Sequence, residues 1–308
     1  MFSLLANIGL ATELIADKYP QSELYSKPVE VIPYVFTAIG ATQPPSYENA
    51  GHNNNLSFIV TDEGVVVING GASNRLAAAL HDEIRKVTDQ PVVLVINENG
   101  QGHAMLGNGY WRDLGVDVLA QEDAVAVTRE NADAILTRMQ SYNRDKAGDT
   151  RVEPANLSFR DSYDISLGGV DIKVLNLGPA HSPGDTQVWI PQWDIMISGD
   201  IAFHERLPPI FADTCSKCWL ETWETKFEPM NPTYIIPGHG HPTNMAQVRR
   251  YTRDYLVDLR TKIAAHIEAG GDLTGAYYVD QSRWSKLHTF QDLATRNAGQ
   301  VFVEMEWE

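Results

Sequence analysis

The sequence predicts an α/β protein in which two halves stack into one domain. Short β-like runs alternate with longer segments of helical periodicity along the chain. Each half runs strands first and then helices, and no repeat, low-complexity segment or Gly/Ser-rich linker separates them. These observations favour a single domain over two tethered ones. We place its core at about residues 29–245 and a C-terminal extension at about 246–308.

The first half opens with strand-like segments. Asp62-Glu63 separates two apolar runs as a hairpin turn would, and Ser73 is placed as a helix N-cap. The nearly continuous apolar run at 91–97 suits a strand that is covered on both faces. Strands are expected at 29–38, 56–61, 64–68, 91–97 and 116–120, and helices after Ser73, at 107–114 and within 124–142.

The second half begins after a polar, loop-like stretch at 145–154. An irregular segment at 203–213 contains Pro208 and Pro209, and a long amphipathic helix at 244–269 ends at Gly270-Gly271. The tail at 301–307 alternates apolar and polar residues, which predicts an edge strand. Further strands are expected at 157–159, 170–175, 186–190, 194–197 and 234–236, and a short helix at 219–227.

Composition excludes some classes of function. Lys and Arg number 24 against 40 Asp and Glu, a formal net charge of −16 at pH 7. Such an acidic chain, without a basic patch, is expected to bind neither nucleic acid nor anionic membranes. No apolar run approaches the roughly 18 residues of a membrane span. Residues 2–11 are apolar but short and lack a preceding Lys or Arg, so we interpret them as a packing segment. We expect a cytoplasmic protein; a periplasmic one would require that a signal peptide had been removed.

Three histidines and one aspartate follow predicted strands in glycine-containing segments. His103 lies in the loop at 97–104, His181 at 178–185, Asp200 at 197–200 and His239 at 237–242. Loops at one edge of the sheets in an α/β sandwich gather into one site, and glycine lets each backbone turn tightly. Three imidazoles and a carboxylate suit an ion of the zinc or iron type.

The ordered set of motifs resembles the metallo-β-lactamase superfamily, which includes glyoxalase II and many hydrolases. The match spans about residues 31–241, and although each motif is weak alone, their order and spacing are specific for the fold. The resemblance implies an αββα four-layer sandwich of two mixed β-sheets with helices outside. The overall pattern of the sequence is also similar to that of zinc-hydrolase-like proteins found with sulfur-oxidation and quinoprotein systems. The motifs are the strand and turn at 65–71, the loop at 97–104, Leu106-Gly107-Asn108 with Tyr110-Trp111, the segment 178–185, Ser198-Gly199-Asp200, and 237–240.

The chain departs from this family at its metal-binding motif, His-x-His-x-Asp-His. The two histidines of the first metal position fall on Asn99 and Gln101, and the aspartate and histidine of the second fall on His103 and Ala104. Asn69 replaces the aspartate that orients a metal-bound histidine in the family. Amide oxygens are poor zinc ligands compared with imidazole, so a complete two-ion site is not expected.

The resemblance assigns the remaining ligands. His181 matches a histidine of the first metal position, Asp200 the bridging carboxylate and His239 the last histidine of the second. We therefore predict one ion, zinc or iron, held by His103, Asp200 and His239 and joined by His181. His103 and Asp200 are also the expected catalytic groups. The expected substrate-binding side chains are Asn99, Gln101, His52 and Glu98.

The two cysteines of the chain, Cys215 and Cys218, have C-x-x-C spacing. One such pair cannot fill a structural zinc site, and we interpret it as two ordinary thiols. A redox pair and a local disulfide remain as alternatives. Trp219, Trp223 and Phe227 recur four residues apart, which predicts a packed helix face.

Two classes of function fit these features. The first is a hydrolase that cleaves an ester, lactone, thioester or amide bond by metal- or His-activated water. The second is a metal-free, non-catalytic member of the fold that binds a small molecule. Redox chemistry at the cysteine pair is a weaker third hypothesis. A small-molecule substrate is the expected partner, and a homodimer through residues 124–142 or the segment from Trp284 would be compatible with the sequence.

Overall fold

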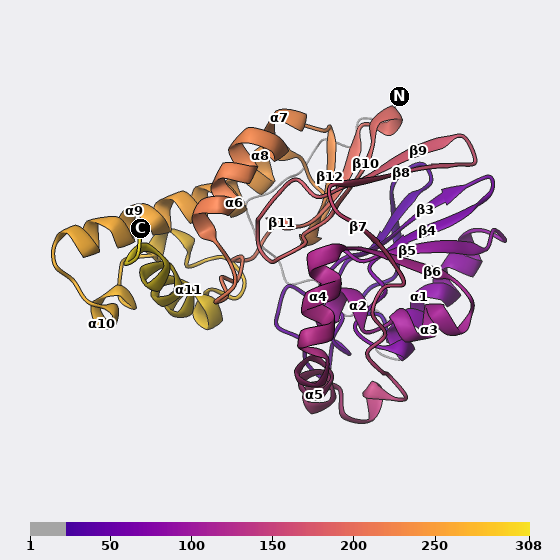
Figure 1. Ribbon diagram of the computed structural model, residues 1–308, viewed down its shortest axis with the longest axis horizontal. Coiled ribbons are helices and arrows are strands. Elements are labelled where there is room, and N and C mark those ends of the chain that lie inside the picture. The colour runs from indigo at the N-terminus through magenta and orange to yellow at the C-terminus, as the bar shows by residue number, and fades with distance from the viewer. Residues whose placement is uncertain (1–22) are drawn as a thin grey trace.

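Two mixed β-sheets form the centre of the molecule, and helices pack against their outer faces (Figure 1). The computed structural model describes residues 23–308, so the packing segment expected at 2–11 lies outside the described residues. The layers are those of an αββα sandwich, as the sequence predicts. Within residues 23–308, no helix has both the length and the apolar character that a membrane span requires.

The first sheet has seven strands in sequence order. Its first four strands are antiparallel neighbours, and the pairs from β4 to β7 are parallel. The single strand expected at 29–38 is two strands, because the chain turns at Tyr34 with a φ of 72°. The strands are β1 (Val29–Ile32), β2 (Val35–Ala38), β3 (Leu56–Thr61), β4 (Gly64–Ile68), β5 (Val92–Ile96), β6 (Asp117–Gln121) and β7 (Leu157–Phe159).

The second sheet has five strands in the order β12-β11-β10-β9-β8. Its pairs are antiparallel except for β11 and β12, which are parallel. The edge strand β8 was not predicted, because most of its side chains are exposed and it lacks an apolar run. The strands are β8 (Ser162–Leu167), β9 (Val170–Leu175), β10 (Gln187–Ile190), β11 (Ile195–Phe203) and β12 (Tyr234–His239).

Alternate residues of β4 face two separate cores. Val66 and Ile68 lie in the cluster between the sheets, together with Ile197 of β11. Val67 packs on the opposite face with Leu76 of α1. Successive strand residues point to opposite faces, so a strand covered on both sides must be apolar throughout. This explains why β4 and β5 are short apolar runs without polar alternation.

The helices of the first half cover the outer face of the first sheet. Ser73 caps α1 as expected, because its Oγ accepts the backbone N–H of Leu76 at 3.1 Å. The helix expected within 124–142 is two helices that meet at Asn131. The helical segments are α1 (Asn74–Val87), α2 (Gly102–Met105), α3 (Asn108–Asp113), α4 (Glu122–Glu130), α5 (Ala132–Asn143) and the 3-10 turn η1 (Arg144–Ala147).

The helices of the second half cover the second sheet and continue into a C-terminal lobe (Figure 1). The prediction of an edge strand at 301–307 is wrong. Ala294, Ala298, Val301 and Phe302 are buried at helical spacing, so this segment packs as the end of a helix. The segments are η2 (Pro191–Trp193), α6 (Ser216–Thr222), η3 (Trp223–Phe227), α7 (Glu228–Met230), α8 (Met245–Val248), η4 (Arg249–Arg253), α9 (Asp254–Glu268), α10 (Leu273–Ala276), η5 (Ser282–Trp284) and α11 (Phe290–Met305).

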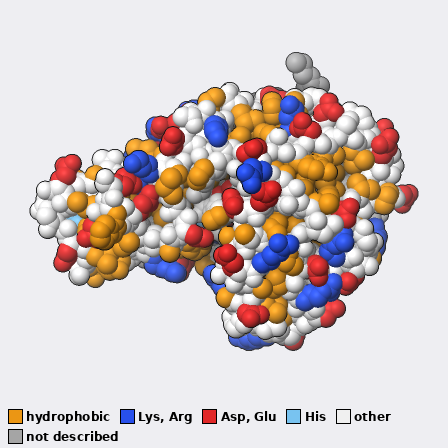
Figure 2. Space-filling model, viewed as in Figure 1, with side chains coloured by type: hydrophobic (Ala, Val, Ile, Leu, Met, Phe, Trp, Pro, Cys, Tyr) orange, Lys and Arg blue, Asp and Glu red, His pale blue; other side chains and the backbone are white. Residues whose placement is uncertain are grey.

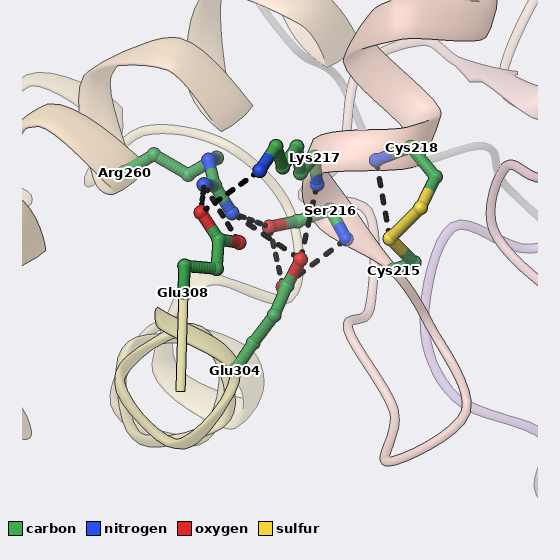
Figure 3. The surroundings of a disulfide bond; sticks show 7 residues. All are labelled: Cys215, Ser216, Lys217, Cys218, Arg260, Glu304 and Glu308. Carbon is green, nitrogen blue, oxygen red and sulfur yellow. Dashed lines mark hydrogen bonds and ion pairs between the residues drawn. A yellow bond between two sulfur atoms is a disulfide. The ribbon is translucent and has the colours of Figure 1, made fainter. Parts of the chain in front are cut away.

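Cys215 and Cys218 form a disulfide at the start of α6. The interpretation as two ordinary thiols is therefore wrong, and of the alternatives left open the local disulfide is the one observed. The two residues between the cysteines are held from α11, since Glu304 accepts from the Ser216 hydroxyl at 2.6 Å and the Lys217 backbone N–H at 3.1 Å (Figure 3). This carboxylate clamp fixes the start of α6. The predicted packed face is confirmed, because Trp219, Trp223 and Phe227 are fully buried.

Charged side chains of both signs are interspersed on the face of the molecule shown in Figure 2. Lys and Arg occur singly or in small groups among Asp and Glu, and apolar atoms lie between them. The described residues on this face therefore form no broad surface of a single charge.

Candidate functional site

Three strands bring the predicted site together. β5 leads into the loop that carries Glu98 and Asn99, and His103 follows in the short helix α2. Asp200 lies within β11 and His239 ends the parallel neighbour β12. Both of these residues are almost fully buried, at 1% and 3% exposure. The strands therefore fix the carboxylate and one imidazole rigidly, and a short helix supplies the second imidazole.

His103, Asp200 and His239 form a compact cluster that could hold a metal ion. Their candidate ligand atoms all lie within 4.8 Å of one another. His239 Nε2 is 3.3 Å from Asp200 Oδ1, and His103 Nε2 is 3.5 Å from Asp200 Oδ2. Ligand atoms bound to one zinc ion at about 2.0–2.2 Å would be separated by similar distances. The structure thus brings together three of the four ligands predicted from the sequence.

The tautomer of His239 decides what its Nε2 can do. Nδ1 lies in hydrogen-bonding contact with the carbonyl oxygen of Asn53, which can only accept, so Nδ1 carries the proton. Burial, together with the nearby Arg206, lowers the pKa of His239 to about 4, so the ring is neutral near pH 7. The lone pair of Nε2 then faces Asp200 Oδ1, which has no hydrogen-bond partner among the described residues. Two electron-rich atoms 3.3 Å apart in a buried site favour a positive charge between them, either a proton or a metal ion.

His103 sits between two carboxylates. Its Nε2 is 3.3 Å from Glu98 Oε1 and 3.5 Å from Asp200 Oδ2, and neither contact has hydrogen-bonding alignment. Burial opposes a charge on the ring, but Asp200 and Glu98 outweigh it and raise the pKa of His103 to about 9. Burial and the neighbouring Asp200 raise the pKa of Glu98. The cluster therefore concentrates negative charge that either a proton on His103 or a metal ion would neutralise.

Asn99 and Gln101 both lie beside the cluster. Asn99 Nδ2 donates to Asp200 Oδ2 at 3.2 Å. Gln101 Nε2 is 3.1 Å from His181 Nε2, which in turn lies 3.8 Å from Asp200. The amide of Gln101 thus stands at the nitrogen through which His181 would bind an ion. His181 borders the cluster without joining it in this arrangement.

The other predicted substrate-binding residues lie deeper. His52 is fully buried, and both of its ring nitrogens contact backbone groups: Nδ1 accepts from Tyr25 N at 2.9 Å and Nε2 is 3.3 Å from the carbonyl oxygen of Ala38. Glu98 is 2% exposed and lies behind His103. The roles assigned to these two residues and to Asn99 and Gln101 stay predictions.

A cavity of about 560 Å³ opens over the cluster. It is lined by site residues at its base, by α4 and α5 on one side and by α11 on the other, and the molecular outline is notched between these helices (Figures 1 and 2). Its volume lies in the range of small-molecule sites. The sequence carries no signal for Arg206, Phe211 and the α11 residues Asp292, Leu293 and Arg296, because they come from an irregular segment and from a stretch in which no element was predicted.

Comparison with known proteins agrees with this architecture. No family model matches the chain. A linear primary-alkylsulfatase from a Pseudomonas species is 22% identical over 252 residues, which are 69% of this chain and 47% of the alkylsulfatase. A type 2 metallo-β-lactamase from Bacteroides fragilis is 23% identical over 193 residues, 59% of this chain and 70% of that protein.

Solved structures decide the fold. A stereoselective inverting sec-alkylsulfatase from a Pseudomonas species superposes with a TM-score of 0.69 at 18% identity, over 91% of this chain and 51% of that chain. A metallo-β-lactamase from Pontibacter korlensis gives a TM-score of 0.60 at 17% identity, over 72% of this chain and 94% of that chain. The chain has the metallo-β-lactamase fold. This metallo-β-lactamase-fold chain spans about half the length of the alkylsulfatases that it matches.

Proposed function

We propose that the protein is a hydrolase that uses one zinc or iron ion held by His103, Asp200 and His239. The observation that carries this proposal is the unprotonated Nε2 of His239 facing Asp200 Oδ1, with no donor between them. The buried Nε2 of His103 is likewise without a hydrogen-bond partner. Two imidazoles and a carboxylate are a suitable donor set for zinc or ferrous iron. When bound, such an ion supplies Lewis-acid activation of water and of the substrate.

The surrounding residues of this chain hold the site in one geometry. The Asn53 carbonyl fixes the His239 tautomer, as outer hydrogen bonds do for metal-binding histidines. Asn99 donates to Asp200 and keeps one carboxylate oxygen in place. Gln101 covers His181 where the resemblance would place a ligand of a second ion. These contacts support one ion in place of two.

The substrate proposed for this site is a small molecule with an ester, lactone, thioester or amide bond. The printed names of the relatives, alkylsulfatase and metallo-β-lactamase, add sulfate esters and β-lactams to the compounds to be tried. The test is a hydrolysis screen of the protein loaded with zinc or with iron, with His239→Ala beside it. Turnover that His239→Ala abolishes supports the proposal. Turnover that His239→Ala retains, or none with any of these bonds, contradicts it.

The same cluster favours one other function, a metal-free binding site. The raised pKa of His103, caused by Asp200 and Glu98 against the effect of burial, lets a protonated imidazole lie between the two carboxylates and offset part of their charge without an ion. A cavity of about 560 Å³ would then bind a small molecule without cleaving it. A folded protein that contains no metal after growth with zinc and iron, yet binds a ligand in this cavity, would favour this function.

A further inference from the structure

Arg206 is a buried cation at the base of the cavity. Its side chain lines the cavity beside His103, Asp200 and His239, although the residue is only 4% exposed. A guanidinium keeps its positive charge in proteins near pH 7. Arginine is rarely buried to this degree unless it is paired.

No carboxylate pairs with this guanidinium among residues 23–308. Nε donates to the carbonyl oxygen of Leu207 at 3.3 Å, and one terminal nitrogen is 3.3 Å from His239 Nδ1, which carries a proton and so cannot accept from it. The other terminal nitrogen has no partner among the described residues, yet it is not sealed from the cavity. Asp200 and Asp292 attract the guanidinium from a distance without forming an ion pair with it. A buried charge without a direct partner is costly, and a ligand in the cavity would supply that partner.

The backbone around Arg206 is fixed from the C-terminal extension. Arg206 forms an isolated parallel bridge with His288, and Leu207 N donates to the His288 carbonyl oxygen at 3.0 Å. Further along the loop, Asn297 of α11 accepts from Ile210 N at 2.9 Å and donates to the Pro208 carbonyl oxygen at 2.8 Å. With its backbone fixed in this way and its Nε bound to the Leu207 carbonyl oxygen, the Arg206 side chain has less conformational freedom to lose when it binds a ligand.

The charges at the cavity mouth, unlike Arg206 at its base, are exposed to solvent. Arg138 and Arg296 are exposed there, and the exposed Asp213 and Asp292 balance them. Solvent screens exposed charges, so these four give little net preference for an anion. At the base, a metal ion or a proton on His103 would offset the charge of Asp200 and Glu98, and Arg206 is then the positive charge left for an anionic ligand.

We propose that the cavity binds a small molecule with an oxyanion group, a carboxylate or a sulfate, and that Arg206 is the residue that pairs with this group. This inference rests on the proposed function only where it treats the bound molecule as a substrate. The binding of the anion itself does not depend on hydrolysis. Arg206 contacts the Nδ1 side of His239, and the opposite nitrogen of the same ring faces Asp200. An anionic group bound to Arg206 would therefore be separated from Asp200 by about the width of the His239 ring. This places it close to the bond that the proposed function cleaves. The walls contributed by Val127, Ile135 and Leu293 suit an apolar remainder of the ligand.

The test uses three ligands that differ only in their head group: hexanoate, hexyl sulfate and the uncharged hexanamide. Isothermal titration calorimetry measures their dissociation constants with the full chain, both stripped of metal and loaded with zinc. The two anions distinguish a carboxylate from a sulfate preference. At least one of them should bind roughly 10- to 150-fold more tightly than hexanamide, which is the range for a hydrogen bond to a charged group.

The variants assign this preference to one residue. Arg206→Met should remove it, Arg206→Lys should restore part of it, and Arg296→Met at the cavity mouth should leave it unchanged. Thermal unfolding of each variant checks that it is folded. The proposal is overturned if hexanamide binds as tightly as both anions, if Arg206→Met keeps the preference, or if none of the three ligands binds. Selective anion binding by a protein that hydrolyses nothing would refute the proposed function and leave this inference standing.

Discussion

A single methyl group at Gly238 tests how closely the two central strands must approach to form the site. An alanine Cβ there would overlap Asp200 Oδ1 and lie 2.9 Å from the carbonyl carbon of Gly199 and 3.0 Å from Asp200 N. Ordinary contact begins at 3.4 Å, so β11 or β12 would have to move by about 0.5 Å. Overpacking of this kind costs about 1–3 kcal/mol. The melting temperature should therefore fall by roughly 2–10 °C.

The same substitution should weaken metal binding, because the Asp200 carboxylate has to leave its position between the histidines. We expect a loss of roughly 10- to 100-fold in affinity, the size seen when the support of a ligand is removed. Calorimetry gives both the unfolding temperature and the affinity for zinc. Gly115→Ala is the control: its φ of 79° strains an alanine, but nothing lies within 4 Å of the added Cβ. A Gly238→Ala protein that binds zinc as tightly as the wild type would refute this account of the site.

Three further predictions follow from residues around the site. Burial lowers the pKa of His52 from 6.5 to about 4. The unfolded chain therefore takes up a proton that the folded chain resists, and the stability is complete above pH 6.5 and falls by about 3 kcal/mol as the pH drops to 4. The free energy of unfolding in urea should depend less on pH across this range in His52→Gln than in the wild type. An unchanged dependence would contradict the assignment of this effect to His52. Replacing Cys215 and Cys218 together by Ser should cost at most about 2 kcal/mol, because the closed loop is short and the carboxylate clamp remains; a larger loss in thermal unfolding, or loss of metal, would argue that the disulfide shapes the site. Asn99→His with Gln101→His should raise the metal content from one to two ions per chain, and a content that stays at one would show that the substituted amides are not what limits the site.

Much of the fold could be predicted because the local signals and the packing agree. The strand at 64–68 is apolar throughout and has an inner and an outer core to fill. Ser73 begins a helix for a local reason, a hydrogen bond to Leu76. The strand prediction at 301–307 was wrong because a short alternation of apolar and polar residues is also compatible with a helix. Only the neighbouring Ala294 and Ala298 reveal the helical face.

Only part of the candidate site could be predicted from the sequence. His103 follows β5, while Asp200 and His239 lie in the parallel neighbours β11 and β12, so their proximity could be inferred from the order of motifs. Arg206 gave no such signal, because its burial depends on a bridge to a segment about 80 residues further along the chain. The tautomer of His239 likewise depends on the carbonyl of Asn53, which is distant in sequence. Long-range backbone contacts of this kind leave no periodic pattern.

The most direct test of the central claim is the metal content of the purified protein, grown with zinc and iron and without strong chelators. Elemental analysis should find about one zinc or iron ion per chain in the wild type and in His81→Ala, whose histidine contacts Tyr110 away from the cluster. His103→Ala and His239→Ala should each lose the ion. A folded wild-type protein with no metal, or variants that retain it, would contradict the site described here.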